Sequence, residues 1–196
     1  MLKIGITGGI GVGKSVVCKI FSTIGIAIYD ADTRAKWLMT NDKILIAAIK
    51  NTFGENAYIG NEIHRDFMIS QILGSPQTAK ELETLVHPAV GRDFAHWITE
   101  QKANTKYILK EAALLYEAGS YKELDKIIVV TADLETRITR VLQRDVHRNR
   151  QQVETIIAKQ MPESEKIRKA DFVIVNDDTK SLIKQVLEIH KYLYVS

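Results

Sequence analysis

Residues 8–15 read Gly-Gly-Ile-Gly-Val-Gly-Lys-Ser and match the phosphate-binding pattern G-x-x-x-x-G-K-[ST] at every fixed position. An apolar run at residues 2–7 precedes this loop, and a stretch with helical spacing follows it at residues 15–24. Glycines let backbone N–H groups turn inward around phosphate oxygens, and the new helix adds its positive N-terminal end. The sequence therefore predicts a P-loop in which Lys14 reaches the β- and γ-phosphates and Ser15 binds Mg²⁺.

Length and composition exclude several classes of protein. The dinucleotide pattern G-x-G-x-x-G fits no register of the loop, which disfavours a Rossmann cofactor site. The chain has 196 residues, 45% of them hydrophobic, and a net charge of +3, which is too small to indicate nucleic-acid binding. No signal peptide is visible, and no apolar stretch approaches 18 residues, so we expect no membrane span. The single Cys18 excludes an internal disulfide, so we expect a cytoplasmic protein with this thiol buried in the first helix.

Strands and helices alternate along most of the chain. Strand-like apolar runs occur at residues 2–7, 26–29, 107–111, 126–131 and 171–175. Helical patterns separate them, including residues 15–24, 134–143 and 181–192. This alternation predicts an α/β fold of the P-loop NTPase type, with a parallel five-stranded sheet covered by helices on both faces. We expect residues 1–196 to form one domain.

Two segments depart from this alternation. Residues 31–102 have helical periodicity and no convincing strand, so we expect a helical insertion, with turns at residues 51–60 and 74–76. The second segment, residues 137–165, begins with an arginine-rich helical stretch over about 137–160. Its arginines, at spacings that share one face of a continuous helix, are Arg137, Arg140, Arg144 and Arg148. Such a face suits a lid that closes over phosphates, and the alternative is a solvated face paired with Glu135 and Asp145.

Three observations favour a small-molecule kinase over a GTPase or a motor. The chain is short, it has no Asn-Lys-x-Asp motif for reading guanine, and Asp30-Ala31-Asp32 follows the second expected strand. Carboxylates at the carboxyl end of a parallel strand point towards the cleft, where they can orient an acceptor hydroxyl or accept its proton. Their alternative role is to cap a helix. Glu111 ends the third expected strand and is a candidate Mg²⁺-associated acid that acts through water. The alternative, for Glu111 and for Glu117 after the next apolar run, is surface charge, and Glu111 is the better candidate because strand ends line the cleft.

Further along, His87-Pro88 is expected to end an apolar helical segment, where a histidine is usually structural. Taken in order, the motifs of the whole chain resemble the dephospho-CoA kinase family. The matching segments are Ile-Thr-Gly-Gly-Ile-Gly-Val-Gly-Lys-Ser (6–15), Asp-Ala-Asp (30–32), Leu82-Glu83 with His87-Pro88, Leu-Leu-Tyr-Glu (114–117), Arg144-Asp145, Gln160-Met161 and Ala-Asp-Phe-Val-Ile-Val-Asn (170–176). Lys36 departs from the arginine usual in the family, which keeps a positive charge but loses the bidentate fork.

This resemblance implies transfer of the ATP γ-phosphoryl to the ribose 3′-hydroxyl of dephospho-CoA, with Mg²⁺. It implies that Asp32 orients and deprotonates the hydroxyl and that His87 contacts the acceptor in the insertion. Lys14 and Arg140 then stabilise the transferring phosphoryl, helped by Arg144. The implied ATP-binding residues are Gly9, Ile10, Gly11, Val12, Gly13, Lys14, Ser15, Val16, Arg144 and Asn176, the last lying near the adenine.

Two other readings stay open from the residues themselves. One is another small P-loop kinase that acts on a nucleoside monophosphate. The other is a nucleotide-binding protein without phosphoryl transfer, which has no use for an acceptor-side carboxylate.

Overall fold

The computed structural model describes residues 1–195, without the side chains of residues 73, 74 and 76. The chain divides into two compact units. The first comprises residues 1–30 and the chain from Lys102 onward, and the second comprises residues 31–101. Within the described residues, no helix has the length and apolar character needed to cross a membrane.

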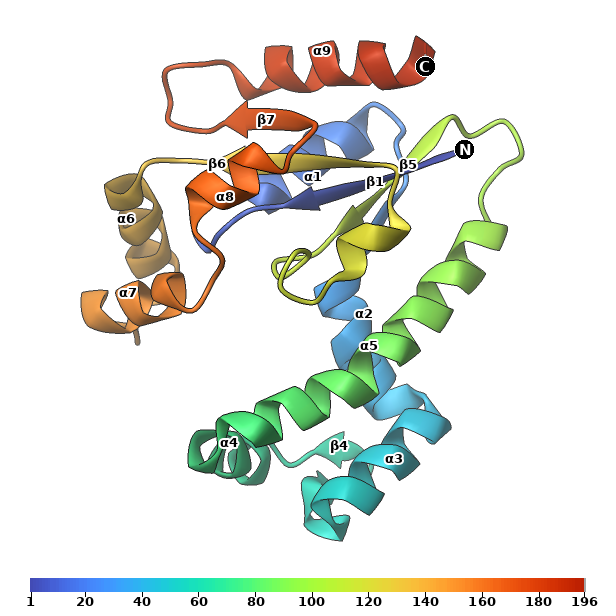
Figure 1. The fold of residues 1–196 in the computed structure, drawn as a ribbon, viewed down its shortest axis with the longest axis vertical. Helices are drawn as coiled ribbons and strands as arrows, with labels where there is room; N and C mark the ends of the chain where they lie inside the picture. The colour runs from blue at the N-terminus through green and yellow to red at the C-terminus, as the bar shows by residue number, and fades with distance from the viewer. Residues whose placement is uncertain (196) are drawn as a thin grey trace. The chain divides into compact units, whose positions relative to one another are not determined.

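A five-stranded parallel sheet organises the first unit (Figure 1). Its strands, in spatial order, are β2 (Ile28–Asp30), β5 (Tyr107–Glu111), β1 (Leu2–Thr7), β6 (Lys126–Thr131) and β7 (Phe172–Val175). The three central strands are buried on both faces, which is why they are nearly continuous apolar runs in the sequence. This confirms the predicted fold class, and three of the five strands have the predicted bounds.

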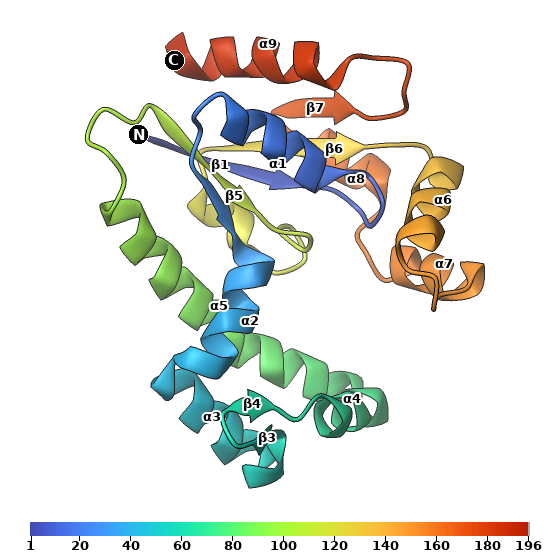
Figure 2. The same ribbon diagram turned by 180° about the vertical axis from the view of Figure 1, so that it is seen from behind.

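Helices cover both faces of this sheet. The helices of this unit are α1 (Lys14–Thr23), α6 (Leu134–Arg144), α7 (Arg150–Ala158), α8 (Glu163–Arg168) and α9 (Leu182–Val195), with a short 3₁₀ helix, η2 (Ser120–Glu123). Figures 1 and 2 show α1 on one face and α8 on the other. Between α1, α9 and the sheet lies the main apolar core, in which Phe21, Ile128 and Val186 are fully buried. Cys18 belongs to this core, as predicted.

The second unit is mostly helical. It contains α2 (Ala31–Asn41), α3 (Lys43–Phe53), η1 (Glu55–Ala57), β3 (Tyr58–Ile59), β4 (Glu62–Ile63), α4 (Arg65–Gly74) and α5 (Pro76–Thr99). The expectation of no strand in this segment is wrong, because β3 and β4 form a small antiparallel hairpin. Strands of two residues are too short to produce an alternating pattern, so the sequence around residues 51–60 predicted only a turn.

Helix α5 corrects a second expectation, because the apolar segment does not end at His87-Pro88. The helix continues through Pro88 to Thr99. Proline removes one backbone hydrogen bond from a helix interior. Here the helix persists because Val86, Ala89 and Phe94 are buried against the rest of the unit on the face away from solvent.

The expected arginine-rich helix is also interrupted. Helix α6 ends at Arg144, and α7 begins at Arg150 after an Asn149 cap whose side chain accepts from the Gln152 N–H. Asn149 and Gln152 form a reciprocal capping box, which favours a new helix start over continuation. A single face carrying all four arginines is therefore not formed.

A part-buried hydrogen bond links β5 to α9. The Tyr107 hydroxyl lies 2.7 Å from His190 Nδ1, and burial raises the pKa of this tyrosine. We predict that Tyr107→Phe lowers the free energy of unfolding by about 1 kcal/mol, because it removes one part-buried hydrogen bond. Urea denaturation measures the change. Tyr194→Phe is the control, since Tyr194 is an exposed residue whose ring lies tilted against the same histidine, with the ring centroids 5.4 Å apart. An equal loss in both variants would contradict the prediction.

Candidate active site

The P-loop connects β1 to α1 and has the geometry of an anion-binding nest. Gly11 and Gly13 adopt left-handed φ values of 83° and 86°, which turn successive N–H groups to one side of the backbone. Within the described chain, the N–H groups of Gly11, Gly13 and Ser15 have no protein acceptor. Since α1 begins at Lys14, its positive N-terminal end adds to the attraction for phosphate.

Lys14 and Ser15 occupy the first turn of α1. The Lys14 ammonium donates to the Gly8 carbonyl at 3.0 Å, so it is folded over its own loop. A phosphate oxygen offers a charged acceptor in place of that neutral carbonyl, which favours exchange when a nucleotide enters. The Ser15 side chain is exposed at the start of the helix, where its hydroxyl is accessible to a metal ion.

Carboxylates meet beside this turn at the carboxyl edge of the sheet. Asp30 and Glu111 are paired across β2 and β5, and Glu111 contacts Cys18 on α1. Burial and the Glu111 carboxylate raise the pKa of the Cys18 thiol, so the thiol is protonated. The described residues contain no cluster of three or more His, Cys, Asp or Glu side chains able to hold a metal ion. A serine hydroxyl and a carboxylate are oxygen ligands of the kind that Mg²⁺ accepts together with phosphates and water.

Arg140 and Asn176 are brought to the same loop. The Asn176 side-chain amide donates to the Val12 carbonyl at 2.8 Å, and Arg140 Nη1 donates to the Asn176 carbonyl at 2.9 Å. The other guanidinium nitrogen of Arg140 makes an ion pair of 3.3 Å with the exposed Asp178. An exposed pair of this kind is weak, so Arg140 can exchange Asp178 for a phosphate at little cost.

The other exposed arginines of residues 137–165 lie elsewhere. Arg144 is exposed at the end of α6, and the described residues offer it no ion-pair partner. Arg148 pairs with Asp145 at 2.5 Å, and Arg150 pairs with Glu135 and Glu154. The Arg148–Asp145 pair agrees with the solvated-face alternative for that arginine. Arg150, which was not part of the expected face, pairs with Glu135 and Glu154, and Arg140 contacts Asn176 and Asp178.

Arg137 is buried, with 4% of its surface exposed, and its guanidinium lies against the P-loop. Its Nε donates to the Ile10 carbonyl at 3.1 Å, and its Nη1 donates to Glu163 at 3.0 Å. The Ile10 N–H donates to Gln160 Oε1 at 3.0 Å, so this N–H is turned away from the phosphate nest. Sequence reasoning assigned no role to Gln160 or Glu163, whose contacts span long separations in the chain.

An ion pair with a buried lysine holds α8, the helix that follows α7. Lys166 is 1% exposed and lies 2.8 Å from Glu117, which also accepts from the Met161 N–H at 2.9 Å. Burial alone would raise the pKa of Glu117, but the Lys166 ammonium and the Met161 N–H outweigh it and lower the pKa. The Leu-Leu-Tyr-Glu motif at residues 114–117 thus contains a structural acid, which the sequence did not distinguish from surface charge.

In the second unit, Asp32 lies in the first turn of α2 and His87 is exposed on α5. A bidentate ion pair between Arg34 and Asp93 joins these two helices, and the Arg34 guanidinium stacks 4.3 Å from the Trp37 ring. Lys36, the departure from the family pattern, is exposed. The unit thus places its candidate acceptor contacts on two helices that are locked together.

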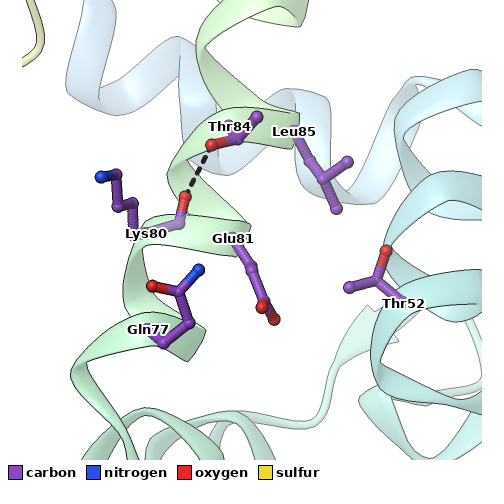
Figure 3. A pocket seen from close by; sticks show the side chains of 6 residues that line it. All are labelled: Thr52, Gln77, Lys80, Glu81, Thr84 and Leu85. Atoms are coloured by element: carbon purple, nitrogen blue, oxygen red, sulfur yellow. Dashed lines mark hydrogen bonds between the residues drawn. The ribbon is translucent and has the colours of Figure 1, made fainter.

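A groove of about 250 Å³ lies between α3 and α5 in this unit (Figure 3). Its lining residues are Thr52, Gln77, Lys80, Glu81, Thr84 and Leu85. Figure 3 shows Glu81 and Leu85 directed towards Thr52, whereas Lys80 points to the other side of α5. The groove therefore has hydroxyl, amide and carboxylate groups with one apolar wall.

The parallel sheet and the Gly-rich loop at the start of α1 define the class of P-loop kinase folds. A family model described as dephospho-CoA kinase matches residues 2–181. The chain is 35% identical to the dephospho-CoA kinase of Bacteroides fragilis over 98% of its own length and 93% of that protein. The chain therefore belongs to the dephospho-CoA kinase family, a family of ATP-dependent kinases, as its motifs predicted.

Solved structures agree with this assignment of the fold. A crystal structure of a Thermus thermophilus protein has a TM-score of 0.85 and 30% identity, covering 97% of this chain and 96% of that one. The dephospho-CoA kinase from Campylobacter jejuni has a TM-score of 0.71 and 23% identity, covering 98% and 97%. The second comparison supports the fold alone.

The loop geometry makes Gly11 a sensitive position. A Cβ at Gly11 would overlap the Arg137 backbone carbonyl and would also require a left-handed φ. We predict that Gly11→Ala raises the Kd for Mg·ATP about tenfold or more, since relieving the overlap displaces the nest. Titration calorimetry measures this.

Gly25→Ala is the control for this substitution. Gly25 has a similar φ of 89° but no atom within 4 Å of an added Cβ. Its Kd should stay at the wild-type value, although both variants lose stability from the strained φ. Equal binding by the two variants would contradict a steric role for Gly11.

Proposed function

We propose that the protein transfers the γ-phosphoryl of ATP to the ribose 3′-hydroxyl of dephospho-CoA, giving ADP and CoA. The observation that carries the proposal is the intact P-loop, with Lys14 and Ser15 in place, in a chain that belongs to this family over residues 2–181. In the reaction, the acceptor oxygen bonds to the γ-phosphorus as the bond to the β,γ-bridging oxygen breaks. The hydroxyl proton passes to a carboxylate.

Each predicted site residue has a defined task in this proposal. The nest around Gly11 and Gly13 binds phosphate oxygens, and Lys14 and Arg140 stabilise charge on the transferring phosphoryl. Asn176, whose carbonyl accepts from Arg140 and whose side-chain amide donates to Val12, lies near the adenine of ATP. Arg144 is a further cation for the phosphates. Val16 and the remaining loop residues, Gly9, Ile10 and Val12, shape the nest.

Mg²⁺, held by the Ser15 hydroxyl, would neutralise charge on the β- and γ-phosphates, with Glu111 acting through a water molecule. The acceptor side belongs to residues 31–102, where Asp32 takes the proton and His87 contacts the acceptor nucleotide. On α5, Glu81 of the groove precedes His87 by six residues, or about 9 Å along the helix, but at about 100° per residue the two side chains leave the helix on different sides.

The decisive test is ADP release from Mg·ATP in the presence of different acceptors. We expect stimulation by dephospho-CoA, with CoA as the product, and none by AMP or other nucleoside monophosphates. Stimulation by a nucleoside monophosphate would favour the other small-kinase function. ATP binding without any acceptor-dependent ADP would favour a non-catalytic nucleotide-binding protein.

Removal of the P-loop cation gives a second test. We predict that Lys14→Ala lowers kcat about 10²–10³-fold, because it removes a preorganised charge at the transferring phosphoryl. Lys19→Ala, an exposed lysine further along α1, serves as the matched control and should keep normal turnover. Near-normal turnover in Lys14→Ala would refute this mechanism.

Substitution of the acceptor-side carboxylate, Asp32, gives a third test of the proposed function. Asp32→Asn should lower kcat about 10²–10⁴-fold, the usual contribution of a general base, while the Kd for Mg·ATP stays unchanged. Steady-state kinetics and calorimetry separate the two quantities. The control is Asp66→Asn, another exposed acid in the first turn of a helix in the same unit. Parallel losses of turnover and ATP binding in Asp32→Asn would instead indicate a metal-binding or structural role.

A further inference from the structure

Ile10 is held by contacts from three directions. Its N–H donates to Gln160 and its carbonyl accepts from Arg137, so both polar groups of its backbone are engaged by distant side chains. Its side chain packs against the apolar cluster between α6 and α7, formed by Ile138, Val141 and Val153. Ile10 therefore contacts the proposed lid, residues 137–165, at three places: at Arg137 near its start, at Gln160 near its end, and at the apolar cluster between α6 and α7.

The Arg137 guanidinium, which donates to the Ile10 carbonyl, is itself held in place by neighbouring residues. Arg137 is nearly completely buried and pairs with Glu163 on α8. Glu163 in turn accepts a hydrogen bond from Thr131 at the end of β6. A buried cation is tolerated only when it is paired and hydrogen-bonded, so Glu163 and the Ile10 carbonyl are both required for its burial.

The glycines on either side of Ile10 leave room for these contacts. A Cβ on Gly9 would collide with the Arg137 guanidinium and come within 3.2 Å of Gln160 Oε1, and a Cβ on Gly11 would collide with the Arg137 backbone. Arg137 and Gln160 therefore pack closely against three successive loop residues, 9–11.

We propose that Arg137, Gln160 and Glu163 form a clamp on the Ile10 peptide that fixes the phosphate-binding loop before nucleotide binds. These are positioning residues, because their polar groups are directed to Ile10 and to one another. A loop held in its binding conformation does not lose further backbone freedom when ATP enters, so the clamp raises ATP affinity. The inference rests on the proposed function only in taking the P-loop as the ATP site.

Gln160→Met tests the clamp with little change in side-chain length. Methionine keeps the packing volume but offers only a weak acceptor to the Ile10 N–H. We expect the Kd for Mg·ATP to rise about three- to tenfold, the equivalent of one net hydrogen bond. Amide exchange of Ile10, followed by NMR in the nucleotide-free protein, should become faster, while the KM for dephospho-CoA stays unchanged.

Gln151→Met is the matched control, since Gln151 is an exposed glutamine on α7 within the same lid segment. It should change neither the Kd nor Ile10 exchange. Faster Ile10 exchange in Gln160→Met with an unchanged Kd would overturn the clamp as a determinant of affinity. Unchanged exchange would show that Gln160 does not hold the peptide, and would overturn it as well.

Arg137→Lys provides a second, independent variant. Lysine retains the charge opposite Glu163, but a single ammonium does not reproduce the planar fork that reaches both Glu163 and the Ile10 carbonyl. A weaker Mg·ATP affinity is expected, with thermal denaturation confirming that the variant is folded, and wild-type affinity in a folded variant would contradict the clamp. Because these assays use Mg·ATP alone, a lack of dephospho-CoA-dependent turnover would refute the proposed function and leave the clamp standing.

Discussion

The absence of space around the phosphate-binding loop constrains the rest of the first unit. A side chain at Gly8 would strike the backbone of β6, one at Gly11 would strike the Arg137 backbone, and one at Gly13 would strike the Asn176 amide. These three obstacles come from β6, α6 and the end of β7, which are neighbours because β1, β6 and β7 are adjacent parallel strands. The register of the sheet therefore sets the shape of the anion nest, and each glycine is required by a particular neighbour as well as by its own φ.

The parts of the fold that the sequence predicted well are those with a strong local cause. β1, β5 and β6 have the predicted bounds, because central parallel strands are buried on both faces and appear as unbroken apolar runs. The P-loop was predictable because a fixed pattern of residues encodes a fixed backbone geometry. In the first unit, Lys14, Ser15, Glu111, Arg140 and Asn176 do meet at one edge of the sheet, as strand order requires.

The parts that the sequence did not predict depend on tertiary contacts or on competing local signals. The arginine spacing suggested one continuous face, but the capping box of Asn149 and Gln152 starts a new helix there. Pro88 suggested a helix end, but burial of the opposite face of α5 outweighs one lost hydrogen bond. Gln160 was recognisable only as part of the Gln160-Met161 segment that resembles the family, and Glu163 carried no signal, because their roles come from contacts with residues more than 20 positions away in the chain. The spacing of the arginines alone does not distinguish Arg137, which is buried against the P-loop, from Arg148, which forms an ion pair with Asp145 at the surface.

Cys18 occupies a place in this arrangement that gives it a use in the laboratory. It is the single cysteine of the chain, it lies on the buried face of α1 in the apolar core, and burial beside Glu111 keeps its thiol protonated. A thiol in that state is a poor nucleophile, so alkylating reagents should reach it only when α1 detaches from the sheet. The rate at which Cys18 is modified therefore reports how often the nucleotide-binding edge opens locally. No engineered cysteine is needed for this measurement.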